Sequence, residues 1–387
     1  MNTEKDLIPL LRFPEFLNEK EWQEIELGEI GDVCMCKRIM KDETSPNGDV
    51  PFFKISTFGK VADAFISAQL FFKYKEKYSY PSKGDILFSA AGTIGRCVEF
   101  DGHPAYFQDS NIVWIANNEN LVYNSFLKYI YSIIKWNIDD GGVVKRLYND
   151  SIKKTRILIP SLPEQKRIAK CLSSIDSYIS SINEKVEQLK AHKKSLLQKL
   201  FPQEGNIIPK CRFPEFQEDN TWEKREFKEV IKVNSGRDYK HLSSGNIPVY
   251  GTGGYMLSVD GKLSDHDAVG IGRKGTIDRP QYLKAPFWTV DTLFFLTTCD
   301  GYDIEFIYYL SQIIQWKKYG EQTGVPSLSK ISIENLEVIV PTNIAEQKRI
   351  AETFSSLDKK IELWEKKSTL LEEHKKGLMQ QLFPTNH

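Results

Sequence analysis

The stretch Pro163-Glu164-Gln165-Lys166-Arg167-Ile168-Ala169 decides the fold, because it opens a long heptad series that returns from Glu346 onward. Apolar residues alternate four and three apart at Ile168, Leu172, Ile175, Ile179, Ile182, Val186 and Leu189, then continue at Leu196 and Leu200. This spacing places them on one stripe of an α-helix, as in a coiled-coil seam. Lys193 and Lys375 interrupt the two series at equivalent positions. We therefore predict two long helices that pack on each other, and pack antiparallel if a pseudo-two-fold axis relates the two series.

Both predicted helices carry start and stop signals. Ser161-x-x-Glu164 and Asn343-x-x-Glu346 predict capping boxes, and Pro202 and Pro384 cannot continue a helix. The 33 residues from Ile168 to Leu200 give about 50 Å of helix. A core helix of a globular domain is the alternative interpretation, but neither repeat holds enough other long helices to surround one of this length.

The whole chain is an internal duplication. Leu11-Arg12-Phe13-Pro14-Glu15-Phe16 returns almost unchanged as Cys211-Arg212-Phe213-Pro214-Glu215-Phe216, a shift of 200 (211 − 11). The residues from Glu164 to Ala169 return at a shift of 182 (346 − 164), and so does Leu200-Phe201-Pro202. The shift is constant at the ends of each repeat and drifts only in the middle, where residue identity is lost. Drift without a functional reason is the alternative, but we interpret the pattern as one frame that carries two different recognition surfaces.

The predicted fold is α+β, with two mixed domains joined by the two heptad helices as an antiparallel coiled coil. We place the domains at residues 1–160 and 203–342, and the helices at 161–202 and 343–387. Short apolar runs predict strands at 51–55, 85–88, 111–115, 247–250, 268–271 and 292–296. One helix is predicted in each domain, from an N-cap at Asn124 to Trp136 and from an N-cap at Asp303 to Trp316.

Composition is that of a soluble globular protein. Hydrophobic residues make up 41% of the 387 residues and charged residues 27%, and the net charge is zero. The sequence contains no apolar run of about 20 residues and no secretory signal at the start. The six cysteines form no CxxC pair and no zinc-like spacing with histidine, so we expect reduced thiols in the cytoplasm and no metal site.

Basic residues gather in the predicted loops of both domains, often beside glycine or an aromatic residue. Ala91-Gly92-Thr93-Ile94-Gly95-Arg96 matches Arg273-Lys274-Gly275-Thr276-Ile277-Asp278, and glycine lets a backbone approach a phosphate closely. For any single cluster a solvated face, or a simple turn, is the alternative. Their recurrence in both domains favours contact with phosphates or base edges. The candidate DNA-binding residues are Lys37, Arg38, Lys54, Lys73, Lys75, Arg96, Lys145, Arg146, Arg237, Tyr239, Lys240, Arg273, Lys274, Arg279, Lys317 and Lys318.

We predict no catalytic residue. The sequence lacks a P-loop, a GxSxG elbow, an HExxH pair and the Asn/Asp-Pro-Pro-aromatic motif of amino-methyltransferases. Gly270-x-Gly272-x-x-Gly275 matches the dinucleotide fingerprint, but Asp278-Arg279-Pro280 follows it instead of a helix.

The doubled Glu-Gln-Lys-Arg-Ile-Ala motif, the heptad helices ending in Leu-Phe-Pro and the repeated Arg-Phe-Pro-Glu-Phe together resemble the specificity subunits of type I restriction–modification systems. The resemblance covers essentially the whole chain. It implies two recognition domains that each read half of a bipartite double-stranded DNA site. It also implies a complex with two adenine-N6 methyltransferase subunits and two ATP-dependent restriction subunits, which would hold S-adenosylmethionine, Mg²⁺ and ATP, so that this chain needs no cofactor. A helical scaffold that binds only proteins is the alternative function.

Overall fold

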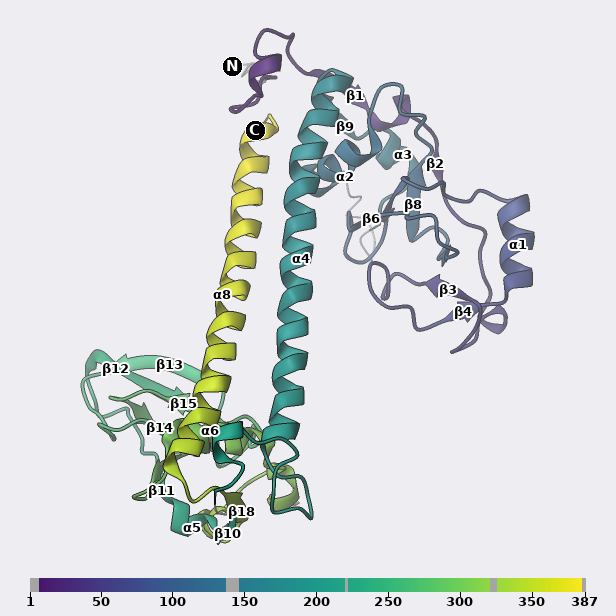
Figure 1. Cartoon of the computed structure of the whole chain (residues 1–387). Helices are drawn as coiled ribbons and strands as arrows, with labels where there is room; N and C mark the ends of the chain where they lie inside the picture. Colours follow the sequence, from purple (N-terminus) through teal and green to yellow (C-terminus); the bar gives the residue numbers. More distant parts are fainter. Residues whose placement is uncertain (1–6, 137–145, 220–221, 321–325, 385–387) are drawn as a thin grey trace. The chain divides into compact units, whose positions relative to one another are not determined.

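The structure is a computed structural model, which describes residues 7–136, 146–219, 222–320 and 326–384. The chain divides into two compact units. Unit 1 comprises residues 1–180 and 369–387, and unit 2 comprises residues 181–368. Each unit therefore contains one of the two mixed domains and a segment of each long helix, and each is described by itself (Figure 1).

Unit 1 is built around an antiparallel sheet of order β2-β8-β5-β6. Its strands are β2 (Val33–Cys34), β5 (Ile86–Ser89), β6 (Cys97–Glu99) and β8 (Ile112–Ile115). A second sheet of order β4-β3-β7 contains β3 (Val50–Phe53), β4 (Phe65–Ile66) and β7 (Tyr106–Phe107). The remaining elements are η1 (Pro14–Phe16), β1 (Gln23–Glu26), η2 (Leu27–Glu29), η3 (Lys41–Glu43), α1 (Ala68–Lys77), α2 (Asn124–Ile133), α3 (Asn149–Lys153) and β9 (Arg156–Ile159), which pairs with β1.

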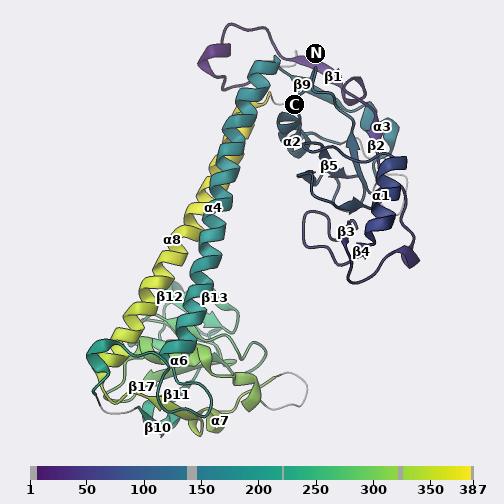
Figure 2. The same ribbon diagram turned by 45° about the vertical axis from the view of Figure 1, so that its right-hand side comes forward.

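The central sheet of unit 1 is covered on both faces. Phe88 and Val113 lie in a core shared with α2, whereas Leu87 and Trp114 lie in a second core shared with the β4-β3-β7 sheet. Successive side chains of a strand point to opposite faces, so β5 and β8 are buried along their whole length. Figure 2 shows α2 and β5 in this unit.

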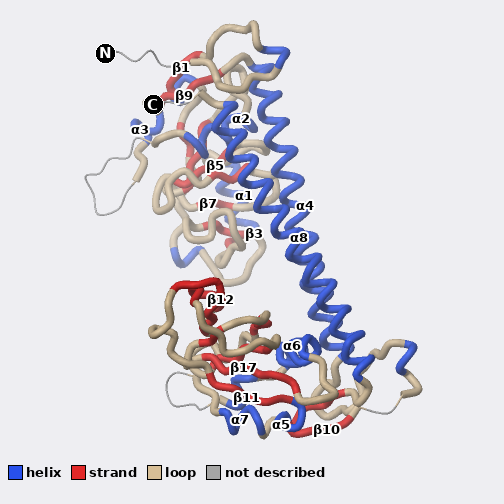
Figure 3. Tube along the Cα trace, turned by 90° about the vertical axis from the view of Figure 1, so that its left-hand side faces the viewer, coloured by secondary structure: helices blue, strands red, loops and turns tan. Residues whose placement is uncertain are grey.

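Unit 2 repeats this plan with sheets of order β11-β17-β14-β15 and β13-β12-β16. Figure 3 shows β11 and β17 running side by side. The strands are β11 (Ile231–Ser235), β12 (Ser244–Gly251), β13 (Gly254–Val259), β14 (Ala268–Gly272), β15 (Gln281–Leu283), β16 (Trp288–Thr289) and β17 (Leu293–Thr298). The remaining elements are η4 (Pro214–Phe216), β10 (Glu223–Glu226), α5 (Phe227–Val230), α6 (Ile304–Ile313), η5 (Trp316–Tyr319), α7 (Lys330–Glu334) and β18 (Glu337–Val340).

The two long helices are α4 (Leu162–Leu200) and α8 (Ile344–Leu382), as the heptad pattern predicts. In unit 2, Asn183 of α4 contacts Ser368 of α8, and Lys193 contacts Asp358, so numbers rise along one helix while they fall along the other. In unit 1, Asp176 of α4 contacts Lys375 of α8. The helix segments within each unit therefore pack antiparallel, which confirms the predicted coiled coil.

The end of each long helix is anchored in a domain core. Phe201, just after α4, is fully buried in unit 2 and stacks on Phe306 of α6. Phe383, just after α8, is buried in unit 1 and stacks on Phe126 of α2. The repeated Leu-Phe-Pro sequence thus ends a helix, and its phenylalanine packs into the core of the adjoining domain.

The drift of the repeat shift has a structural origin. The pairing of Val33 with Ile115 corresponds to that of Val233 with Leu296, a shift of 200 (233 − 33). The pairing of Phe88 with Val113 corresponds to that of Ile271 with Phe294, a shift of 183 (271 − 88). Between these pairs, α1 occupies the connection from β4 to β5, whereas unit 2 passes from β13 to β14 in a short loop. The helix α1 is an insertion that only the first repeat carries at this place.

Two expectations about helix ends are wrong. The domain helices end at Ile133 and Ile313, because Ile134 and Ile314 adopt extended backbone, and the tryptophans that follow fold back toward the core. Asn124 lies inside α2, whose N-cap is Tyr123, whereas Asp303 is the N-cap of α6 as predicted. In the described residues, no helix is both long enough and apolar enough to cross a membrane.

Candidate nucleic-acid interface

A buried ion pair fixes each domain to a long helix. In unit 1 the Arg12 guanidinium donates from Nε and Nη2 to the two carboxylate oxygens of Glu164, at 2.8 and 2.7 Å. In unit 2 Arg212 grips Glu346 in the same way, at 2.7 Å twice. Hydrogen bonding to the carboxylate raises the pKa of both arginines. The glutamates predicted as capping-box residues therefore bind arginine, because a bidentate charged partner outweighs a single backbone N–H.

The glutamine that follows each glutamate fixes the domain helix. Gln165 accepts from the backbone N–H of Tyr123, the N-cap of α2, and donates to the carbonyls of Leu121 and Pro160. Gln347 does the same for Asp303, the N-cap of α6. The repeated Glu-Gln sequence thus positions each domain on its helix.

In unit 1, candidate basic residues meet at the loop 108–111, between β7 and β8. Arg38 donates to the Asp109 carboxylate at 2.8 Å, and Arg146 donates to the carbonyl of Ser110 at 2.8 Å. Ser110 has φ of 55°, a left-handed conformation that is uncommon outside glycine. Arg96 donates to the carbonyl of Phe58 at 3.1 Å. Arg38 and Arg146, which are far apart in the sequence, thus both contact this one loop.

Beside this loop lies a shallow depression of about 390 Å³. Its lining is Met35, Ser110, Val113, Arg146, Leu147, Tyr148, Asn149 and Asp150. Unit 2 has a depression of about 330 Å³, lined by Ser235, Arg273, Lys274, Phe294, Ser327, Leu328, Ser329 and Lys330.

The two depressions occupy equivalent places in the repeats. Val113 and Phe294 occupy the matching strand position, and the isolated bridges Ala91–Arg146 and Lys274–Ser327 close equivalent loops. The framework is therefore common to both, while the chemical lining differs. Unit 1 presents one arginine beside Tyr148, whereas unit 2 presents Arg273, Lys274 and Lys330 beside serines.

The matching of the two glycine loops needs a correction of one residue. Gly92 and Gly275 both have positive φ, of 68° and 81°. The bridges join Ala91 to Arg146 and Lys274 to Ser327, so Ala91 and Lys274 are equivalent positions of the two repeats. The loops therefore correspond at a shift of 183 (275 − 92), so Arg96 corresponds to Arg279 and not to Asp278. Their shared function as tight turns needs the left-handed backbone that glycine adopts without strain.

Arg38 and Arg96 are not among the residues that line these depressions, and the remaining described candidates do not line them either. Lys37 lies over the Tyr78 ring, and Lys75 of α1 lies over Phe71 and Tyr80. Lys73 is exposed on the same helix. Lys54 pairs with Asp63, at 2.8 Å between Nζ and Oδ1.

In unit 2, Lys317 pairs with Asp278 and Lys318 lies near Glu204, while Arg237, Lys240 and Arg279 are exposed. Tyr239 packs against an apolar core around Trp288, so that its ring is a structural contact. Lys145 lies outside the described residues.

The sequence alone missed several lining residues. Tyr148 is 57% exposed beside Arg146, and Lys330 begins α7 beside Arg273. The internal repeat could have pointed to them, because Leu147 and Leu328 are equivalent positions. Each is followed by a short helix and then by the last strand of its domain.

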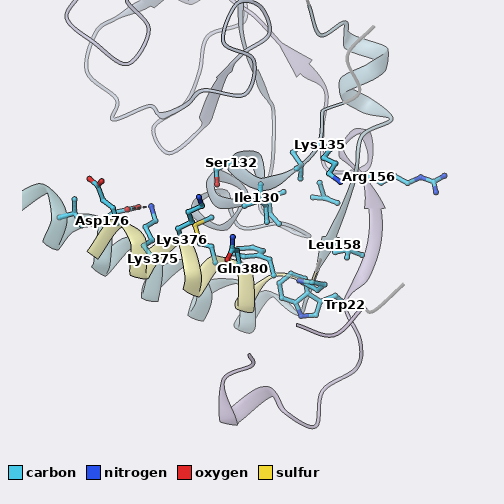
Figure 4. A pocket seen from close by; sticks show the side chains of 18 residues that line it. Trp22, Ile130, Ser132, Lys135, Arg156, Leu158, Asp176, Lys375, Lys376 and Gln380 are labelled. Carbon is cyan, nitrogen blue, oxygen red and sulfur yellow. Dashed lines mark hydrogen bonds and ion pairs between the residues drawn. The ribbon is translucent and has the colours of Figure 1, made fainter. Parts of the chain in front are cut away.

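A larger cavity of unit 1 lies elsewhere, where α2 and β9 face the segments of α4 and α8 (Figure 4). It measures about 750 Å³ and combines apolar residues such as Ile130, Leu158 and Met379 with the cations Lys135 and Lys376. Within the described part of the chain, no group of three or more histidine, cysteine or acidic side chains is arranged to hold a metal ion. All six cysteines are free thiols, and burial raises the pKa of Cys36 and of Cys97 to about 12.

Comparison with known proteins identifies this architecture. The family model for the type I restriction modification DNA specificity domain matches twice, at residues 19–191 and 219–373. A Haemophilus influenzae protein named as a type I restriction enzyme specificity subunit is 59% identical over 160 residues, which span 41% of this chain and 42% of that protein. The chain thus spans less than half the length of this relative. The MjaVIII specificity subunit of Methanocaldococcus jannaschii is 27% identical over 264 residues, or 58% of this chain and 60% of that subunit.

Two solved structures share the fold. The S subunit of the type I restriction–modification system from M. genitalium superposes with a TM-score of 0.67 at 18% identity, covering 98% of this chain and all of that one. A chain from a study of assembly and conformational transition in a type I system gives a TM-score of 0.51 at 15% identity, covering 93% and 96%. With the family model matched in both repeats, the chain belongs to the specificity subunits of type I restriction–modification systems.

Proposed function

We propose that each unit reads one half of a bipartite double-stranded DNA target through the depression beside its glycine loop. The observation that carries this proposal is the recurrence of the depression in both repeats on one framework with two different linings. A shared framework with divergent side chains is what two independent base-reading surfaces need. Arginine and lysine supply bonds to guanine edges or phosphates, and tyrosine and serine supply adaptable hydrogen bonds.

The bulk charge of the chain offers no help to DNA binding, since it is zero. Affinity must come from the local groups, and Arg273, Lys274 and Lys330 make unit 2 the more cationic of the two depressions. Arg146 and Arg38 serve unit 1, each held by one hydrogen bond to the loop 108–111 while other guanidinium N–H groups remain to bind phosphate.

The long helices would set the spacing between the half-sites and dock the methyltransferase subunits. A helix of 39 residues such as α4 is about 58 Å long, which is enough to separate two contact surfaces by more than one turn of B-DNA. Apolar side chains remain exposed on the helices, with Tyr178 at 45%, Leu363 at 65% and Leu370 at 54%. In this proposal these side chains would lie under the methyltransferase subunits, where burying them is favourable.

In this proposal the chain is a recognition subunit and performs no catalytic step. Two adenine-N6 methyltransferase subunits would supply S-adenosylmethionine chemistry, and two ATP-dependent restriction subunits would supply translocation and cleavage. The chain would act in the cytoplasm, where its partners meet DNA.

The test is binding of the purified chain, alone and with its methyltransferase partner, to a library of random DNA duplexes. We expect enrichment of two short motifs at a fixed gap, with affinity that falls steeply as salt rises because phosphate contacts release counterions. A scaffold that binds only proteins would show neither enrichment nor a salt slope, and that outcome would contradict the proposal.

A further inference from the structure

The polar interruption of each heptad seam forms a three-residue contact that occurs once in each unit. In unit 2, Lys193 of α4 pairs with the Asp358 carboxylate of α8, at 2.7 Å from Nζ to Oδ1. The Tyr309 hydroxyl of α6 donates to Oδ2 of the same carboxylate at 3.0 Å. In unit 1, Lys375 of α8 pairs with Asp176 of α4, and Tyr129 of α2 donates to Asp176 at 2.8 Å.

The lysine completes the contact by lying over the ring of the tyrosine. The distance from Nζ to the ring centroid is 5.2 Å for Lys193 over Tyr309 and also 5.2 Å for Lys375 over Tyr129. Each set of three, called here a Lys–Asp–Tyr key, therefore joins α4, α8 and the domain helix at one point. Among the described contacts, no other ion pair between the two long helices also binds a side chain of a domain helix in this way.

The two keys specify the same helix register. The residue numbers of Lys193 and Asp358 add to the same total as those of Asp176 and Lys375, and Asn183 and Ser368 again give that total. An apolar seam is non-directional, and leucine or isoleucine contacts tolerate small slides and rotations. A charged hydrogen bond does not, because it weakens steeply once the donor leaves its line.

The key carries a cost that an apolar seam would avoid. Lys193 is only 15% exposed, and its position would otherwise hold an aliphatic residue. Replacing such an ion pair by apolar residues often leaves stability unchanged or raises it. Polar residues inside a seam are best attested as devices that select register. Burial first, and then the neighbouring carboxylate, raise the pKa of Tyr309 and Tyr129, which keeps both phenols as neutral donors.

We propose that the two Lys–Asp–Tyr keys are positioning residues for DNA specificity, which fix the register and rotation of each recognition domain on the helix pair and so sharpen the gap between half-sites. This inference rests on the proposed function. The key touches no depression residue and acts through the frame, so its loss should change which gaps are accepted and leave the half-site sequences unchanged.

The test replaces the keys by apolar residues and measures gap preference. The variant carries Lys193→Met, Asp358→Leu and Tyr309→Phe with Lys375→Met, Asp176→Leu and Tyr129→Phe. We expect the penalty for changing the gap by one base pair to fall by about tenfold, or about 1.4 kcal/mol, with the same half-site motifs enriched. The matched control is Lys190→Met with Glu365→Leu, an ion pair across the same helices that involves no domain residue. The control should keep the gap preference of the unaltered chain.

A second readout does not depend on DNA. Spin labels at Tyr255 of β13 and Leu363 of α8, both exposed and both in unit 2, report how firmly the domain is held on its helix. The labels are placed in a background without the natural cysteines, whose fold is checked by circular dichroism. We expect a narrow distance distribution in this background and in the control, and a broadened one in the key-less variant. The milder pair Asp358→Asn and Asp176→Asn keeps the tyrosine contact and the side-chain volume, so it guards against misfolding and should broaden the distribution partly.

The possible outcomes separate the two proposals. Unchanged distance and gap distributions in both sets of variants would overturn the positioning role of the keys. Broadened distances without any gap preference in the unaltered chain would support the keys as positioning residues and contradict the proposed DNA function.

Discussion

Single residues fix the frame through charge and shape. The side chains of Arg12 and Glu164 are 4% and 1% exposed, so the guanidinium and the carboxylate form their hydrogen bonds away from water. Arg167 forms a comparable ion pair at the surface: it pairs with Glu15 and lies over the Phe13 ring, and its side chain is 45% exposed. The difference in burial predicts a difference in stability, because a buried partner left alone keeps an unpaired charge.

We expect Arg12→Met to destabilise unit 1 by about 3 kcal/mol, since it leaves Glu164 buried without a partner. Arg167→Met should cost less than about 1 kcal/mol, because its ion pair is solvated. Urea unfolding of the full chain, followed by tryptophan fluorescence, measures both. An equal loss of unfolding free energy in the two variants would show that burial does not determine how much the Arg12–Glu164 pair contributes to stability.

Basic residues of the two glycine loops give a second prediction at this scale. Arg273→Ala and Arg96→Ala should weaken binding to the selected site. A residue that grips a base should lose about 1–3 kcal/mol and relax specificity at one position, whereas one that holds phosphate should lower the salt slope by about one. Arg156→Ala is the matched control, because Arg156 is an exposed arginine of β9 that pairs with Glu24 and lies outside both depressions and both glycine loops. Unchanged affinity in both loop variants would mean that these loops are turns and nothing more.

At the scale of elements, sequence pattern predicted the parts whose burial is continuous. Strands β5, β8, β14 and β17 are buried on both faces and read as short apolar runs, and α4 and α8 carry a heptad seam. The pattern did not show the short strands β2, β4 and β7, because each has only two residues, nor α1, in which only Phe71 is buried. The loop 108–111 is ordered by Arg38 and Arg146, which no local sequence signal connects to it.

The helix pair gives a prediction at this scale. One heptad added after Lys190 of α4 and one after Lys360 of α8 falls at facing positions, so the Lys193–Asp358 contact stays intact on one side and Asn183–Ser368 on the other. Each helix should lengthen by about 10 Å. The preferred gap should grow by about three base pairs, while the half-site sequences stay the same.

The measurement is a binding selection on duplexes whose gap length varies. Because three base pairs turn one half-site by roughly a quarter to a third of a helical turn, methylation is expected to weaken even where binding survives. A folded variant whose preferred gap has not moved would show that the helices do not set the spacing.

The whole molecule repeats one plan with divergent interiors. The frame residues were readable from the sequence, because Glu164 and Glu346 with their neighbours repeat at a constant shift. The candidate site was only partly readable, since clustering of charge pointed to Arg146 and Arg273, which line the depressions, but also included Tyr239, whose ring packs into a core. Side-chain direction decides which loop residue lines a depression, and it depends on packing between distant segments.

Independence of the two units predicts a modular exchange. Replacing residues 17–155 by the corresponding region of another specificity subunit should change one half of the target and leave the other half intact. The exchange keeps Arg12 and Glu164, so the new domain meets the same frame. Motif sequencing after binding selection reads the result, and a change in both halves would sink the modular interpretation.

The most direct measurement of the central claim is the methylome of a methylation-free host that expresses the adenine methyltransferase partner with and without this chain. The account predicts one new bipartite motif, with adenine methylated in both halves across a fixed unspecified gap, and only when this chain is present. A contiguous motif, or a methylome that does not depend on this chain, would contradict the proposal that its two units read the two halves of one DNA site.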